Sequence, residues 1–182
     1  MDFEHVGNAP CLELANSVPD RREEGDRDWL GSAEIADGWA RSLDLELAST
    51  PSGRDLADLR AFREDVFETF TAIASGTQAP QRSLNSITDA HSRGLRTRGY
   101  RPSGRGIVRD WPRMWDVPSL IALFADSALK ELTGDRLDRV KSCPSCGWLF
   151  VDTSRNRSRR WCSMQTCGGR DKALRHYRKT RD

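Results

Sequence analysis

Four cysteines in the last quarter of the chain have the spacing of a metal site. Cys143 and Cys146 form a C-x2-C pair, and after fifteen residues Cys162 and Cys167 form a C-x4-C pair. A two-residue gap lets a tight turn direct two thiolates at one ion, and the loop brings the second pair opposite. Tetrahedral coordination by four sulfurs suits zinc. The spacing therefore predicts one structural zinc ion with no coordination position left open for catalysis.

Other chemistries fit the same cysteines less well. Two disulfides would need an oxidising compartment, and the N-terminal residues lack the basic and apolar stretches of a signal peptide. An iron–sulfur cluster is less consistent with the knuckle spacing and the flanking arginines. A redox C-x-x-C would open a helix, whereas the β-like segment WLFVD follows here. The fifth cysteine, Cys11, lies on a short apolar segment and is predicted to be a buried, inert thiol.

Positive charge surrounds the second cysteine pair. Guanidinium groups match phosphate oxygens and can also read guanine in the major groove of DNA. We therefore expect the partner to be nucleic acid, in particular double-stranded DNA, contacted by basic residues before and after this pair: Arg155, Arg157, Arg159, Arg160, Arg170, Lys172 and Arg175.

The distribution of charge along the chain supports an anionic partner at the C-terminal end. Residues 1–135 contain 16 basic and 23 acidic residues, a net charge of −7, whereas residues 136–182 contain 13 basic and 4 acidic residues, a net charge of +9. A basic tail on an acidic body is typical of proteins that bind polyanions. The alternative is that the arginines dock on the acidic body, or on another protein, and bind no nucleic acid.

Hydrophobic periodicity predicts a mainly α fold in two domains. Residues 1–135 should form a helical bundle that folds without zinc, with helices beginning at Ser32, Ser52, Pro80 and Pro118 and a small β-hairpin turning near residues 102–104. Residues 136–182 should form a zinc-bound ββα module, because about forty residues cannot form a stable core unaided. In that module GWLFV is expected to pair with RRWCS, and a basic helix follows Cys167.

The cysteine-rich segment resembles a known family. CGWLFVDTSRNRSRRWCSMQTCGGR is similar to the CGNR zinc finger, and LELANS at residues 12–17 resembles the opening motif of the ABATE domain that precedes this finger in the family. The resemblance implies zinc binding and a role as a transcription regulator that binds DNA. Gly169 stands where the family has its name-giving Asn, and glycine is acceptable at a helix N-cap. Glu13 and Ser17 replace an expected Asp and Thr.

Other functions find less support in the sequence. Its three histidines, His5, His91 and His176, are scattered, and no phosphate-binding glycine loop is present, so no catalytic residue is assigned and we expect no enzyme. No apolar run approaches the roughly 20 residues of a membrane helix. We therefore expect a cytoplasmic protein without a membrane partner.

Two alternatives to DNA binding remain. The zinc module could serve protein–protein contact, or the helical domain could sense a small-molecule effector, with Asn16, Arg21 and Trp39 as candidate pocket residues. A homodimer is left open, since short modules gain specificity by pairing, although no heptad seam is visible.

Overall fold

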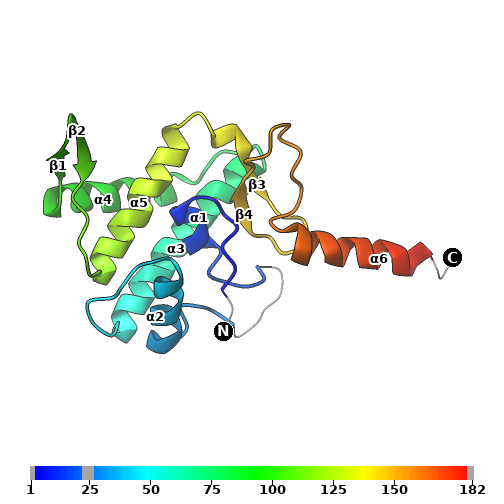
Figure 1. Ribbon diagram of the computed structural model, residues 1–182, viewed down its shortest axis with the longest axis horizontal. Coiled ribbons are helices and arrows are strands. Elements are labelled where there is room, and N and C mark those ends of the chain that lie inside the picture. The colour runs from blue at the N-terminus through cyan, green and yellow to red at the C-terminus, as the bar shows by residue number, and fades with distance from the viewer. Residues whose placement is uncertain (1–2, 22–26, 180–182) are drawn as a thin grey trace.

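The computed structural model describes residues 3–21 and 27–179, apart from the side chains of residues 175, 176, 178 and 179. Within this part, the mainly helical fold predicted from the sequence is confirmed (Figure 1). Its helices and strands are α1 (Pro10–Ala15), α2 (Ala33–Ser42), α3 (Gly53–Ala74), α4 (Gln81–Thr97), β1 (Tyr100–Ser103), β2 (Gly106–Arg109), α5 (Val117–Thr133), β3 (Val140–Ser142), β4 (Leu149–Val151) and α6 (Gly169–Lys179). No helix in these residues is long and apolar enough to cross a membrane.

The long helix α3 begins and ends where its sequence signals lie. The Ser52 side chain accepts a hydrogen bond from the Asp55 N–H, and the Asp55 carboxylate accepts one from the Ser52 N–H, which closes a capping box. Its buried stripe includes Leu56, Val66 and Phe70. The helix stops just before Gly76, whose positive φ of 69° suits glycine.

Helix α5 packs in the middle of the bundle. Asp116 caps its first turn by accepting a hydrogen bond from the Ser119 N–H, and Gly134 follows its last residue. Buried residues occur around most of its surface, as its nearly continuous apolar sequence predicts, because α1, α3 and α4 all pack against it. The helix that begins after Ser32 is shorter than the helical spacing of Ile35, Trp39 and Leu43 indicates. It ends at Ser42, and Leu47 instead forms a β-bridge with Trp115.

Strands β1 and β2 form the predicted hairpin. Arg101 pairs with Val108 and Ser103 with Gly106, and Gly104 in the turn has a positive φ of 58°. The hairpin projects from the bundle at the end of the molecule opposite α6 (Figure 1).

The C-terminal module contains the expected two strands and helix, but one strand lies elsewhere in the sequence. β4 pairs antiparallel with β3, so that Val140 faces Val151 and Ser142 faces Leu149. The expected partner RRWCS is not a strand, and that part of the prediction was wrong. The β-branched residue Val140 begins a strand directly before the knuckle, so the C-x2-C turn itself connects the two strands.

Candidate metal centre and nucleic-acid interface

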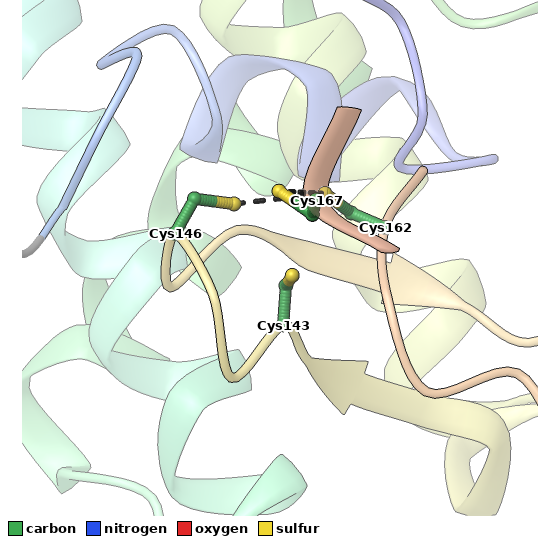
Figure 2. Close-up of side chains that lie close together, drawn as sticks. All are labelled: Cys143, Cys146, Cys162 and Cys167. Atoms are coloured by element: carbon green, nitrogen blue, oxygen red, sulfur yellow. Dashed lines mark hydrogen bonds between the residues drawn. The ribbon is translucent and has the colours of Figure 1, made fainter. Parts of the chain in front are cut away.

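The four predicted ligands converge from three separate segments (Figure 2). Cys143 follows β3, and Cys146 lies in the turn before β4. Cys162 follows the arginine-rich segment, and Cys167 lies in a single turn of π-helix, Met164–Gly168, that leads into α6. All four side chains are buried, and their sulfur atoms lie within 4.8 Å of one another.

The spacing of the sulfur atoms fits one tetrahedral zinc ion. With Zn–S bonds of about 2.3 Å, tetrahedral geometry places neighbouring sulfurs roughly 3.8 Å apart. The Cys146 and Cys162 Sγ atoms are 3.6 Å apart, as are those of Cys162 and Cys167. These distances are too long for disulfides and leave no room for a multi-iron cluster. The site therefore holds one structural zinc through Cys143, Cys146, Cys162 and Cys167, as the sequence predicts.

Backbone hydrogen bonds shape the knuckle around the first two ligands. The Cys143 N–H donates to the Trp148 carbonyl over 2.7 Å, and the Gly147 N–H donates to the Cys143 carbonyl over 2.9 Å. Gly147 has a φ of 79°, a conformation that disfavours a side chain. The knuckle and the second cysteine pair thus bring four buried thiols together, and zinc would bind all four as thiolates.

An internal ion pair fixes the loop between the second strand and Cys162, residues 152–160, which we name the arginine loop. Asp152 is fully buried and its carboxylate accepts hydrogen bonds from Lys141 Nζ over 2.6 Å and from the Arg159 N–H over 3.0 Å. Lys141 Nζ also donates to the carbonyls of Arg157 and Arg159. Burial of Asp152 opposes ionisation, but the hydrogen bonds from Lys141 and Ser154 outweigh it and hold its pKa well below the usual range.

The remaining bonds of the loop come from Ser154 and Arg139. Ser154 donates through its N–H and its hydroxyl to Asp152 Oδ1, and it accepts a hydrogen bond from the Ser158 N–H. Arg139 Nη1 donates to the carbonyls of Asp152 and Ser154. The loop is therefore pre-organised by its own contacts, although it has no regular secondary structure.

Two of the four arginines in this loop have partners within the module. Arg159 donates to the carbonyls of Trp161 and Cys162 and lies over the Phe150 ring, so its guanidinium supports a zinc ligand. Arg157 has a positive φ of 51° and pairs with Asp138, although its side chain remains 54% exposed. Sequence spacing alone does not separate these two from the others.

The other two arginines point to solvent. Arg155 is exposed, and no described residue forms an ion pair with it. Arg160 is exposed and lies over the Trp161 ring, with its guanidinium carbon 5.2 Å from the ring centroid. Their charges are therefore available to a partner outside the chain.

Helix α6 carries the remaining predicted contacts. Lys172 is exposed, and Arg170 is 57% exposed with one nitrogen 3.9 Å from the Asp20 carboxylate. The side chain of Arg175 lies outside the described residues. The helix extends away from the rest of the molecule (Figure 1). Gly169 is already helical, with φ −63° and ψ −44°, and is therefore not an N-cap.

The module attaches to the helical bundle through the open edge of β4. The side-chain amide of Asn16 donates to the Leu149 carbonyl over 2.8 Å and accepts from the Leu149 N–H over 2.9 Å. Two residues further along β4, the Val151 N–H donates to the Gly7 carbonyl and the Val151 carbonyl accepts from Asn8 Nδ2. These bonds satisfy backbone groups that an edge strand otherwise leaves unpaired.

Aromatic and apolar packing completes this attachment. The Trp148 indole donates to the Val18 carbonyl over 2.6 Å and packs edge-on against Trp29. Leu149, Phe150 and Val151 belong to the same buried cluster as residues of α1, α3 and α5. Among the described residues, no side chain of the arginine loop pairs with a carboxylate of residues 1–135. The bundle and the finger are held together by β3, β4, Trp148 and a hydrogen bond from the Arg21 N–H to the Cys146 carbonyl, with no ion pair from these arginines.

The residues suggested for an effector pocket are structural instead. Asn16 pairs with β4, Trp39 is buried against Phe124, and Arg21 bonds to Glu64 and to the Ala15 carbonyl. A cavity of about 490 Å³ lies elsewhere, between α3, α4 and the start of α5, and none of the three lines it. Cys11 is buried as predicted, and burial raises the pKa of its thiol to about 12.

Sequence reasoning missed the residues that position the site. Lys141 and Arg139 bond to the arginine loop and Asn16 bonds to β4, yet none of the three lies between the first and last cysteine of the cluster. The signal for Lys141 is the isolated Asp152 that follows an apolar strand within a basic segment, since a buried carboxylate needs a cationic partner. Asn16 is part of the LELANS motif and a candidate pocket residue in the sequence analysis, but nothing in the sequence indicates its pairing with β4.

Comparison with known families assigns both parts of the chain. The model of the CGNR zinc finger matches residues 139–180. The model of ABATE, described as "putative stress-induced transcription regulator", matches residues 8–135. A search of curated proteins found no significant match.

Proposed function

Because the chain belongs to the ABATE family and carries a CGNR zinc finger, we propose that it is a transcription regulator that binds double-stranded DNA through the arginine loop and α6. In this proposal zinc is structural. It holds the end of the arginine loop and the start of α6 together, because Cys162 and Cys167 lie at these two places.

The observation that carries the proposal is the internal bracing of the arginine loop. Asp152 and Lys141 form six hydrogen bonds that hold the loop from inside. Lys141 donates to Asp152 and to the carbonyls of Arg157 and Arg159, and Asp152 also accepts from the Arg159 N–H and from the N–H and hydroxyl of Ser154. A loop that is ordered before binding loses little conformational entropy when it meets a partner. Arg155 and Arg160 are then presented to solvent without internal carboxylate partners.

The chemistry of these exposed groups favours phosphate as the ligand. Guanidinium groups form paired hydrogen bonds with phosphate oxygens, and Lys172 adds a point charge on α6. Arg157 keeps over half of its side chain exposed and can exchange Asp138 for a phosphate. Arg159 is left out of the proposed contacts because its Nε and Nη2 already bond to backbone carbonyls.

Titration of labelled duplex DNA at several salt concentrations tests the proposal. Each phosphate contact contributes about 0.9 to the slope of log affinity against log salt. Arg155→Ala with Arg160→Ala should therefore reduce that slope by roughly 1.8. Arg41→Ala with Arg54→Ala removes two exposed arginines of α2 and α3 and is the matched control, which should leave the slope unchanged.

The protein–protein alternative predicts a different outcome. Zinc-loaded protein that shows no affinity for duplex DNA even at low salt would exclude the proposal, and the exposed arginines would then serve an acidic protein surface. Equal slopes for the arginine-loop variant and the control would exclude these two residues as phosphate contacts.

A further inference from the structure

A second basic segment lies in the acidic part of the chain. Residues 93–113 contain seven arginines and a single acidic residue, Asp110, although residues 1–135 as a whole carry a net charge of −7. The segment comprises the C-terminal end of α4, the β1–β2 hairpin and the residues that lead to α5. We name its exposed arginines, together with the hairpin, the hairpin surface: Arg93, Arg96, Arg98, Arg101, Arg105 and Arg113.

Most of this charge is not neutralised within the protein. Arg101 approaches Asp110, with its Nε 3.4 Å from the carboxylate. Within the described residues, the other five arginines of the hairpin surface have no carboxylate partner. Like charges close together in one segment repel one another, so their clustering costs stability that an anionic partner would recover.

The seventh arginine, Arg109, is an anchor and fixes how the hairpin projects. Its side chain is only 7% exposed and lies between the Tyr100 and Trp111 rings, with its guanidinium carbon 5.4 Å and 4.7 Å from their centroids. Its Nη1 donates to the carbonyls of Arg98 and Gly99, and its Nε lies 3.6 Å from Asp126 on α5. A lone two-stranded hairpin is marginally stable. Arg109 therefore holds this one against the bundle.

Beyond that anchor the hairpin is open to solvent on both faces. Every residue of β1 and all of β2 except Arg109 are exposed, including Ile107 at 69% and Tyr100 at 55%. A sheet with two solvated faces and exposed apolar side chains needs an explanation other than packing. The major groove of DNA is wide enough to admit a two-stranded ribbon of this kind.

We propose that the hairpin surface is a second contact surface for double-stranded DNA, in which its arginines bind backbone phosphates. This inference rests on the proposed function and adds a DNA contact to the helical domain, which the zinc finger alone does not supply. The hairpin and α6 lie at opposite ends of the long axis (Figure 1), so a duplex that contacts both would run along that axis.

Replacing Arg101 and Arg105 by alanine tests this surface. The variant removes one arginine from β1 and one from the turn, and neither packs in the core. In the duplex titration it should lower the salt slope by roughly 1.8. The ratio of wild-type to variant affinity should therefore be about 60-fold larger at 0.1 M salt than at 1 M salt. The Arg41→Ala, Arg54→Ala control should retain wild-type affinity, and thermal unfolding should confirm that all variants are folded.

The same titration separates failure of this inference from failure of the proposed function. If wild-type protein binds and the Arg155→Ala, Arg160→Ala variant is weakened while the hairpin variant matches the control, the hairpin surface is not a DNA contact. If wild-type protein does not bind at all, both proposals fail. Sedimentation of the DNA-free protein adds a third outcome, because a loss of self-association in the hairpin variant would identify the partner as a second copy and overturn the inference.

Discussion

Replacing Asn16 by alanine tests whether the helical bundle and the zinc finger form one cooperative unit. The Asn16 amide forms two hydrogen bonds with the backbone of Leu149 in β4, and both residues are fully buried. Alanine removes both bonds and leaves the Leu149 N–H and carbonyl without partners in a place that water does not reach. The free energy of unfolding should fall because two hydrogen bonds are lost and two buried backbone groups are left unpaired.

The magnitude follows from the cost of unsatisfied polar groups. Each buried group left without a partner costs about 1–3 kcal/mol, so two groups amount to about 2–6 kcal/mol. A domain of this size is stable by about 5–15 kcal/mol, and the loss is therefore a large fraction of the total.

Urea unfolding monitored by circular dichroism measures the effect with zinc bound. Asn85→Ala on the exposed face of α4 is the matched control and should change the free energy by less than about 1 kcal/mol. If Asn16→Ala is no more harmful than Asn85→Ala, the pairing with β4 does not hold the two parts together. We also expect the wild-type protein to unfold in a single transition, with the same midpoint for the bundle and the finger.

Three further substitutions test individual sites. Asp152→Asn should destabilise the finger by about 3–5 kcal/mol, because it leaves the Lys141 charge without its buried partner, and an unchanged unfolding midpoint would contradict this. Burial raises the pKa of Glu13 to about 7, because folding favours its protonated carboxyl. The stability that this protonated carboxyl contributes is complete below about pH 4 and is lost as the pH rises through 7. Glu13→Gln keeps the acceptor for the Gly7 N–H and should therefore gain stability relative to wild type between pH 5 and pH 8, whereas a constant difference between the two proteins would refute the argument. Gly169→Asn restores the family residue in a helical position where an added Cβ meets only the Met164 carbonyl oxygen, at 3.8 Å. Because glycine is a poorer helix former than asparagine, the substitution should raise stability by a few tenths of a kcal/mol. A lower melting temperature would contradict this expectation.

Features with a local cause could be predicted from the sequence. The capping box of Ser52 and Asp55, the turn at Gly104 and the zinc ligands each depend on residues close together in the chain or on a characteristic spacing. Helices α3 and α5 follow from their apolar patterns, because a helix buries its stripe wherever it packs.

The rest depends on contacts between distant residues. The choice of β3 over RRWCS as the partner of β4 is decided by the knuckle turn, which joins β3 and β4 directly. The pairing of Asn16 with Leu149 spans more than a hundred residues, and no periodic pattern in the sequence predicts it. The sequence also cannot distinguish Arg159, which supports Cys162, from its exposed neighbour Arg160, because both belong to the same basic run.

Zinc-dependent DNA binding is the most direct test of the central claim, that a structural metal presents the arginine loop and α6 to DNA. Metal content and affinity for duplex DNA should be measured on the same protein before zinc extraction, after it, and after zinc is restored. The predicted result is about one zinc per chain, with an affinity that disappears with the metal and returns with it. Unchanged affinity in the zinc-free protein would contradict the claim.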